Sequence, residues 1–359
     1  MATVMPVKAP PGPDTATVSP IRPRSFHMRD VVILAMSVAS SFALAWLLYF
    51  QLLPFSGGQG FLIFWVSLFV LLYYVAVRDL DGPVIAKDRT MNALIAIFTV
   101  AVVVPLVLIL GYVTLKGIRF LRLTFFTTTL ATVGPESTPE EAGGLHAIVG
   151  TIEQVGIAMI ISVPLGVLTA VYLNEVRGRL RRPVRIFVDT MSGVPSIVAG
   201  LFIYSMLIAG GGQFSGFAAA LALAVLMLPT VTRTTEVVLR LVPDGLREAS
   251  LALGGPQWRT VSRVVLPTAR SGIITAVILG VARVVGETAP VIMTAFGSSV
   301  MNWNPFSGPQ AALPLSSFRL FQGTESQVHM AWTFAFVLVS LVLVLFVLAR
   351  RIGRRQFAP

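Results

Sequence analysis

The sequence contains no cysteine, only three histidines and few charged residues, and each shortage excludes a class of protein. Without cysteine there is no disulfide, no thiol nucleophile and no cysteine-ligated metal site. The histidines are far apart in the chain, so no helix brings two of them onto one face as metal ligands. Only 12% of the residues are charged and 55% are hydrophobic, whereas a soluble domain carries about 25% charged residues. The composition therefore predicts a polytopic membrane protein.

Several catalytic motifs are also missing. The sequence has no G-x-x-x-x-G-K-[ST] loop, so the chain does not hydrolyse ATP itself. It has no H-E-x-x-H motif, and no serine–histidine pair falls at one depth of the apolar segments. We therefore expect no catalytic residues, no metal site and no cofactor in this chain, and a membrane-embedded enzyme is a remote alternative.

Apolar segments of membrane length follow one another along the chain. A bilayer is crossed by roughly 20 apolar residues in a helix. Runs with few or no charges predict spans at about 31–53, 61–77, 91–115, 147–173, 187–208, 216–239, 269–296 and 331–349. The expected fold class is an all-α polytopic membrane protein with about eight transmembrane helices.

The basic residues are distributed unevenly between the two sides that these spans define. With the N-terminus inside, 22 of the 27 Lys and Arg residues lie in inner segments and only four in outer ones. Cytoplasmic loops of membrane proteins carry such an excess, so both termini are expected in the cytoplasm and the chain in the plasma membrane of a bacterium. The net charge of +11 thus reflects topology, and we expect contact with membrane lipid and no nucleic acid.

A polar island at 247–267 lies on the predicted cytoplasmic side. Its first half has the apolar spacing of a short helix, which Gly254 is expected to end in a left-handed C-cap. Pro256 can open a second helix, and Pro267 is expected to end it. A helix-turn-helix with apolar and charged faces suits docking to a partner, although an ordinary interfacial hairpin is the simpler alternative.

The island resembles the EAA coupling loop of ABC importer permeases. That family's pattern is Glu-Ala-Ala, three residues, Gly, nine residues, then Ile, any residue, Leu-Pro. At the same spacing this chain has Glu248-Ala249-Ser250, Gly254 and Val264-Val265-Leu266-Pro267. The resemblance implies an EAA loop at 244–267 in which Glu248, Ala249, Gly254, Leu266 and Pro267 couple to an ATPase.

Arg283 is a cation placed deep inside a predicted span, far from either end. Near the middle of the segment 269–296 it is costly unless it faces protein or water. Glu287 is four residues on, on the same helix face, and is expected to neutralise it. The planar guanidinium suits an oxyanion such as phosphate, so both residues are candidates for a substrate pathway. The alternative is a buried ion pair that only fixes helix register.

The sequence around Arg283 resembles the PstA family of phosphate-specific permeases. The run ARVVGETAP follows the EAA-like loop at the spacing of that family, and the segments 149–175 and 191–202 are also similar to it. The resemblance implies an ABC type-1 (MetI-like) transmembrane domain at 146–349 and a permease subunit of an ATP-driven phosphate importer. It further implies a PstC-like permease, a PstB-like ATPase dimer that holds ATP and Mg²⁺, and a PstS-like phosphate-binding protein.

The remaining segments are assigned by composition. Residues 1–30 are expected to form a disordered cytoplasmic tail, 31–90 an additional hairpin with its loop, 91–145 the third span and a periplasmic loop, and 350–359 a basic tail. Two other functions stay open: a permease for sulfate or molybdate, and a transporter or channel that needs no ATPase.

Three further predictions concern acidic residues near the ends of the spans. Arg233 and Glu236, three residues apart, are expected to form a helix-end pair. Asp189 is expected to stabilise the first turn of the span at 187–208. Glu153 is a weak candidate for the substrate pathway.

Overall fold

The computed structural model describes residues 28–53, 56–176 and 178–354, and these form helices joined by turns and loops. Among these residues, extended backbone pairs only in an isolated bridge between Phe296 and Gln310. The expected all-α class is therefore confirmed. The predicted tail at 1–30 lies almost entirely outside the described residues, as does the end of the basic tail, 355–359.

The chain divides into two compact units, Met1–Val107 and Leu108–Pro359. The first unit contains α1 (Met28–Trp46), which continues as the π-helix η1 (Leu47–Leu52), then α2 (Gly58–Asp81) and the beginning of α3 (Pro83–Arg119). The predicted boundary at residue 90 falls inside α3.

The first unit has its own core and its own ion pairs. This core is a cluster whose buried members are Ile33, Phe69, Tyr73, Val77 and Ala86. At one end of the hairpin the guanidinium of Arg89 bridges two carboxylates, Asp30 at 2.8 Å and Asp81 at 3.1 Å. These ion pairs fix the amino end of α3 to α1 and α2.

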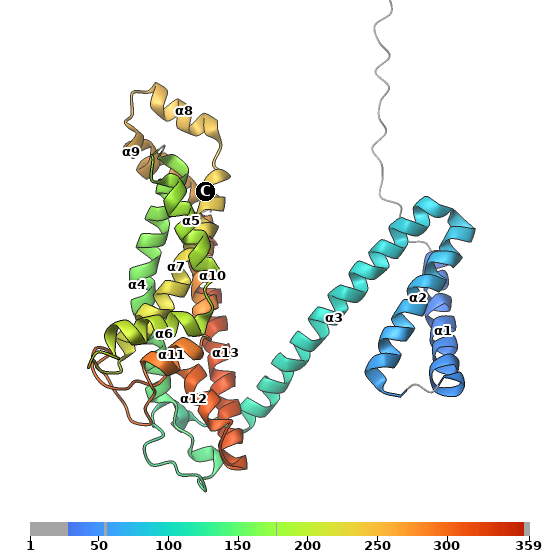
Figure 1. Ribbon diagram of the computed structural model, residues 1–359, viewed down its shortest axis with the longest axis horizontal. Coiled ribbons are helices and arrows are strands. Elements are labelled where there is room, and N and C mark those ends of the chain that lie inside the picture. The colour runs from blue at the N-terminus through green and yellow to red at the C-terminus, as the bar shows by residue number, and fades with distance from the viewer. Residues whose placement is uncertain (1–27, 54–55, 177, 355–359) are drawn as a thin grey trace, which may run out of the picture. The chain divides into compact units, whose positions relative to one another are not determined.

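The second unit carries the remaining helices (Figure 1). Its elements are the end of α3, η2 (Leu123–Phe126), η3 (Pro139–Glu141), α4 (Leu145–Glu175), α5 (Arg181–Ser192), α6 (Ser196–Leu207), α7 (Gly216–Arg240), α8 (Asp244–Ala252), α9 (Gln257–Thr260), η4 (Val261–Val265), α10 (Leu266–Val284), α11 (Ala289–Thr294), α12 (Leu313–Leu320) and α13 (Glu325–Arg354).

Seven of the described helices are long and apolar enough to cross a membrane, and there are eight if the bent pair α5–α6 is counted as one span. The span predicted at 187–208 is not one continuous helix, because it falls on α5 and α6, which meet at an angle of 107°. Gly193 and Pro195 lie in the break, where proline cannot continue the helix of α5. Together α5 and α6 still follow α7 from one of its ends to the other. Arg185 contacts the carboxyl end of α7, and Ile208 packs near its amino end.

Helix α7 is the centre of the second unit. Two-thirds of its most apolar stretch is buried (67%), whereas about a quarter of the corresponding stretches of α4, α10 and α13 is buried. Small residues bring its neighbours close: a Cβ on Gly166 of α4 would lie 3.0 Å from the Val231 side chain, and one on Gly280 of α10 would lie 2.8 Å from the same side chain. Close packing through glycine is typical of helices in lipid, where apolar burial alone does not drive association.

The two ends of the second unit can be told apart by their contacts. At one end the carboxyl ends of α4 and α7 meet α8 and α9, which project beyond them (Figure 1). At the other end Thr151 near the start of α4 accepts a hydrogen bond from the Leu313 N–H at 2.8 Å. The arginine-rich α5 and the island at 247–267 therefore share one end, as the charge distribution requires.

Candidate functional site

The island forms a helical hairpin whose turn follows from its glycines. Helix α8 ends in a Schellman motif, in which the Gly254 N–H donates to the Leu251 carbonyl at 2.9 Å and the Gly255 N–H donates to the Ser250 carbonyl at 3.3 Å. Gly254 has φ +79°, a conformation that a residue with a Cβ rarely adopts. The predicted left-handed cap is confirmed.

The second half of the hairpin does not end at Pro267. Helix α9 passes through the π-helix η4 directly into α10, so helical backbone continues from Gln257 to Val284. A proline inside an α-helix clashes with the carbonyl four residues earlier. The wider π turn precedes Pro267 and relieves this clash, and the Thr268 hydroxyl donates to the Val264 carbonyl at 2.6 Å. The predicted end at Pro267 is wrong for this reason.

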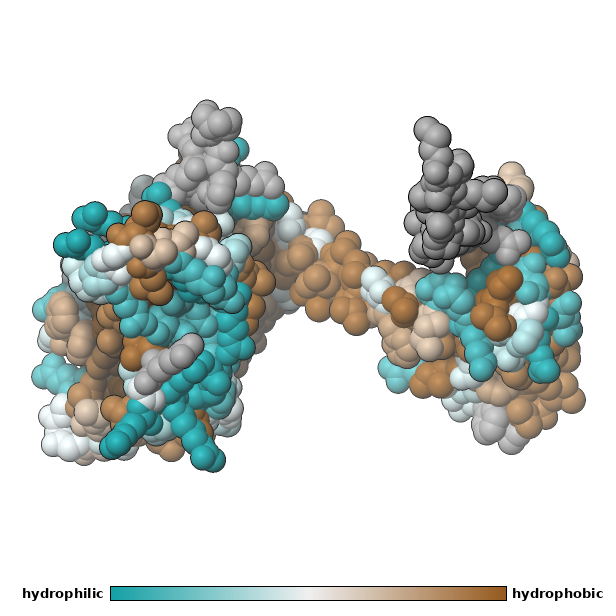
Figure 2. All heavy atoms as spheres, turned by 90° about the horizontal axis from the view of Figure 1, so that it is seen from above, coloured by the Kyte–Doolittle hydropathy of each residue, from teal (hydrophilic) through white to brown (hydrophobic). Residues whose placement is uncertain are grey.

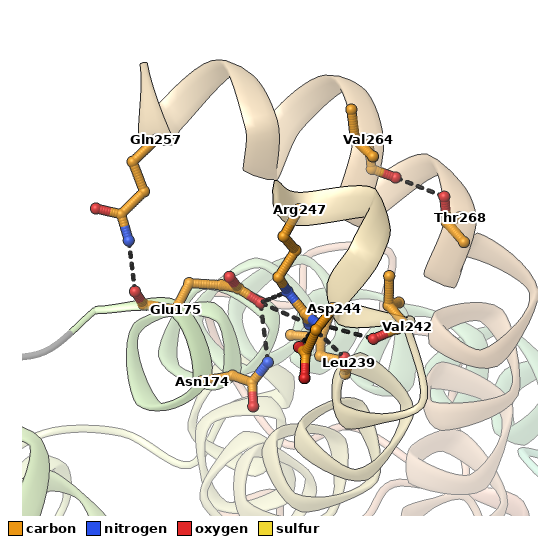
Figure 3. A network of polar contacts seen from close by, with 9 residues as sticks. All are labelled: Asn174, Glu175, Leu239, Val242, Asp244, Arg247, Gln257, Val264 and Thr268. Carbon is orange, nitrogen blue, oxygen red and sulfur yellow. Dashed lines mark hydrogen bonds and ion pairs between the residues drawn. The ribbon is translucent and has the colours of Figure 1, made fainter. Parts of the chain in front are cut away.

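Arg247 fastens α8 to the ends of two membrane helices (Figure 3). Its guanidinium donates to the Glu175 carboxylate at the end of α4, with Nη2 at 3.1 Å and Nε at 3.3 Å. It also donates to the Leu239 carbonyl at 2.8 Å, the Val242 carbonyl at 2.7 Å and the Asp244 carboxylate at 2.8 Å. The Arg247 and Glu175 side chains are only 16% and 10% exposed. This single side chain thus fixes the orientation of α8.

Two further contacts hold the hairpin together. The Gln257 amide at the start of α9 donates to the backbone carbonyl of Glu175 (Figure 3). The hydroxyls of Ser250 and Thr260 lie 2.9 Å apart, so they join α8 to α9. Ser250 stands where the EAA pattern has a second alanine, and its hydroxyl makes this contact between the two halves.

The outer surface of the hairpin carries large apolar residues that are exposed. Helix α8 has no buried residue. Leu253 is 90% exposed and Trp258 is 63% exposed, and the Arg259 guanidinium lies 5.1 Å from the centre of the Trp258 ring. Figure 2 looks onto this end of the second unit and shows hydrophobic residues among hydrophilic ones. An exposed apolar surface with a polar rim indicates a docking site for a protein.

The predicted coupling residues are all part of this hairpin. Glu248 and Ala249 are exposed on α8, Gly254 makes the turn, and Leu266 and Pro267 begin α10. The structure thus brings the two halves of the EAA-like pattern to the same end of the second unit.

The predicted pair of Arg283 and Glu287 does not form. Helix α10 ends at Val284 rather than continuing to 296, so Glu287 lies in the non-helical segment before α11. The spacing i, i+4 places two side chains together only within one continuous helix. Among the described residues, the side chains of Arg283 and Glu287 have no hydrogen-bond or ion-pair partner, and the Glu287 backbone N–H donates to the Val284 carbonyl at 3.1 Å. The expected neutralisation of Arg283 is therefore wrong.

Arg283 lies in the last turn of α10 and is exposed, whereas Glu287 is half-buried. The carboxyl end of a helix carries a partial negative charge, so a cation in the last turn is stabilised without an acidic partner. The rise from Arg270, near the amino end of α10, to Arg283 is roughly 20 Å. This depth still falls within a hydrocarbon layer of about 30 Å, although it is no longer the middle of a helix.

Helix α6 supports the segment that follows Arg283. A Cβ on Gly200 of α6 would lie only 2.7 Å from the Cα of Pro290 in α11. Only glycine allows two backbones to approach so closely. Helix α6 follows α5 in the chain, and we call the two helices the α5–α6 arm. The packing of this arm against Pro290 thus sets the position of the break between α10 and α11.

A buried carboxylate joins α5 to α7 near the end that carries the hairpin. Glu236 is 2% exposed and accepts from Arg185 of α5 at 2.6 Å, from Arg233 at 2.6 Å and from Arg240 at 2.5 Å. The predicted pair of Arg233 and Glu236 is confirmed. Asp189 lies past the middle of α5 and pairs with Arg233, so its predicted position in a first helical turn is wrong.

Sequence reasoning missed the long-range pairs. Arg247 and Glu175 are 72 residues apart and Arg185 and Glu236 are 51 apart, and no local pattern connects them. The one signal was the run of arginines at 177–185, most of which lie at the start of α5, and in the sequence alone these arginines are interpreted as a mark of topology. Glu153, the weak pathway candidate, accepts a hydrogen bond from the Gln310 amide at 2.5 Å, and thereby holds the loop before α12.

Residues 162–357 match the family described as "Binding-protein-dependent transport system inner membrane component". This match contains the hairpin, Arg283 and all residues of both arginine–carboxylate networks. It lies entirely within the second unit.

Three relatives are similar over most of their own length. The phosphate transport system permease protein PstA 1 of Mycobacterium tuberculosis is 46% identical over 241 residues, which cover 65% of this chain and 78% of that protein. PstA of Mycobacterium leprae is 44% identical over 72% of this chain and 88% of that protein. PstA of Pasteurella multocida is 37% identical over 66% of this chain and 83% of that protein.

Proposed function

The chain belongs to the binding-protein-dependent transport inner membrane components and, among them, to the PstA permeases, and on this premise we propose how it moves phosphate. It is a permease subunit of an ATP-driven phosphate importer, and the hydrolysis of ATP takes place in a separate subunit. The phosphate permeases among its relatives favour phosphate over sulfate or molybdate, and the coupling hairpin argues against a transporter without an ATPase.

Arg283 is the residue that we assign to the transiting anion. Its charge is offset by the carboxyl end of α10 and by no acidic side chain of the described residues, so its donors are free. A guanidinium offers two parallel N–H groups to a tetrahedral oxyanion. The unpaired guanidinium at a break in a membrane helix is the observation that carries this assignment.

The break after Arg283 supports the same assignment. Backbone that is not helical at membrane depth is tolerated only where protein covers it or water reaches it. The segment between α10 and α11 therefore faces a partner subunit or a water-filled pathway rather than lipid. Glu287, half-buried in this segment, repels the anion and prevents it from being held too tightly to leave.

The hairpin at 244–267 receives the motion of the ATPase. Its exposed apolar residues, Leu253 and Trp258 among them, suit insertion into a groove of an ATPase dimer of the PstB type, which supplies the ATP and Mg²⁺. A PstC-like permease completes the pathway, and a PstS-like binding protein delivers phosphate on the outer side. The excess of basic residues at the hairpin end favours a cytoplasmic position for this end and for both termini.

Uptake in reconstituted vesicles tests this function. The importer complex with ATP and Mg²⁺ on the ATPase side is expected to accumulate phosphate, and omission of ATP, Mg²⁺ or the ATPase is expected to stop it. Arg283→Ala should abolish uptake while the complex still assembles. Arg270→Ala is the matched control, because Arg270 is an exposed arginine of the same helix near its inner end.

Two results would contradict the proposal. Normal uptake by Arg283→Ala would remove Arg283 from the pathway. Transport of sulfate or molybdate in preference to phosphate by the unaltered complex would refute the substrate.

A further inference from the structure

The carboxylate of Glu236 links α5 to α7 through charges that cannot separate without cost. Two of its three arginines, Arg233 and Arg240, belong to α7 itself, whereas Arg185 belongs to α5. Arg233 also pairs with Asp189, which adds a second connection to α5. Because Glu236 is 2% exposed, water cannot replace an arginine that leaves it.

The arm that begins at this link ends against the Arg283 segment. Helix α5 bends by 107° into α6, and Gly200 of α6 touches Pro290 at the start of α11. Helix α11 follows directly on the segment 285–288 that leaves Arg283. A movement of α5 relative to α7 therefore displaces the backbone beside Arg283 through the contact between α6 and α11.

The charges around Glu236 also make the link sensitive to this one side chain. With Glu236 ionised, the three arginines are partly compensated by the two carboxylates of Glu236 and Asp189. Without that negative charge, Arg185, Arg233 and Arg240 repel one another at one end of α7. The repulsion acts across α5 and α7, because only Arg185 among these arginines lies on the separate element.

We infer that Glu236, acting through Arg185, is a positioning residue that clamps α5 to α7. Because of this clamp, α5 and α6 move together when the ATPase acts, and α6 positions the backbone beside Arg283. This inference rests on the proposed function only for the importance of Arg283 to phosphate. The clamp itself requires only that ATP changes the conformation of the permease.

A thiol reporter can follow the Arg283 segment directly, since the chain has no cysteine of its own. Gly286→Cys is a suitable position: a Cβ there meets no atom within 4 Å and the backbone is not left-handed. The rate of maleimide labelling of this cysteine is measured in the purified importer complex, with and without ATP and Mg²⁺. Phosphate uptake by the same complex in vesicles is measured in parallel.

The inference predicts a specific pattern among variants made in the Gly286→Cys background. Glu236→Gln and Arg185→Ala should reduce the ATP-dependent change in labelling about threefold or more, the scale of coupling mutations. Arg240→Ala is the matched control: it removes an arginine from the same carboxylate but not from the link to α5, and should leave the change within about twofold. Arg185→Lys, which keeps the charge, should restore part of the response.

Each result separates the clamp from the phosphate function. An ATP-dependent change that persists in both Glu236→Gln and Arg185→Ala overturns the clamp, whatever the uptake. A reporter that never responds to ATP in the background complex overturns it as well. Absent phosphate uptake together with the predicted labelling pattern contradicts only the proposed substrate and supports the clamp.

Discussion

Replacing Arg247 by alanine should detach α8 from the membrane helices. The change removes contacts to two carboxylates and two backbone carbonyls and leaves Glu175, 10% exposed, without its cation. Removal of one partner from a buried ion pair costs about 3–5 kcal/mol. Arg247 is 16% exposed at the water-facing end of the unit, so screening lowers this to about 2–3 kcal/mol. The population of detached α8 should then rise by about 30- to 150-fold.

Hydrogen–deuterium exchange measures this detachment directly. The amides of α8 and its turn, residues 244–255, exchange when the helix opens locally, so their exchange should accelerate by about the same factor. The amides of α7 above the network should change little, because the buried core of α7 does not depend on Arg247. Retention of the ATPase during purification should fall in parallel.

Asp244→Asn is the matched control for this experiment. Asp244 also pairs with Arg247, but its side chain is 88% exposed, and an exposed pair contributes about 0–1 kcal/mol. Exchange in 244–255 should therefore change by less than about fivefold in this variant. Unaltered exchange in Arg247→Ala, or equal acceleration in both variants, would refute the argument that burial of the Glu175 pair fixes α8.

Three further predictions follow from single positions. Gly254→Leu forces a side chain into a left-handed backbone at a cost of about 1–2 kcal/mol and should weaken co-purification of the ATPase, whereas Gly245→Leu in the open first turn of α8 should not. Glu287→Gln should lower the KM for phosphate and also the maximal uptake rate, because an anion held more tightly leaves more slowly; an unchanged KM would exclude Glu287 from the pathway. Gly200→Ala should destabilise the chain by about 1–3 kcal/mol through its clash with α11, while Gly156→Ala, which meets open space, should raise the midpoint of thermal unfolding; equal midpoints would contradict the packing.

The fold could largely be predicted from the sequence because lipid imposes simple rules. Long apolar runs without charges can only be helices, and basic residues mark one side. The left-handed turn at Gly254 was predictable too, since glycine after an apolar helical face commonly ends a helix.

The breaks within apolar segments were harder to predict. A proline such as Pro195 or Pro290 is compatible with a kink, with a bend of 107° or with the end of the helix. Tertiary packing determines which of these occurs. The pairing of Arg283 with Glu287 failed because it assumed a continuous helix, whereas α10 ends at Val284. At Pro267 the sequence predicted the end of a helix, but the helix continues because a π turn precedes the proline.

The polar networks were beyond sequence reasoning for a different reason. Arg247 and Glu175 meet only because α4 and α7 pack side by side, and their separation in the chain carries no periodic signal. Arg185 is one of several arginines in the segment 177–185. The positive charge of this segment was already explained by the excess of basic residues on the cytoplasmic side, so nothing singled out Arg185. The polar residues that connect the ends of different helices are therefore identified by the structure and not by the sequence.

The uninterrupted passage of α9 through η4 into α10 has a mechanical consequence. Twenty-eight residues of helix make a stiff rod of about 42 Å, with Trp258 near one tip and Arg283 at the other. A rod without a joint cannot absorb a twist applied at its tip, so rotation of the hairpin turns the guanidinium by a similar angle around the axis. The same rotation moves that charge around the helix axis without any change in its depth in the bilayer.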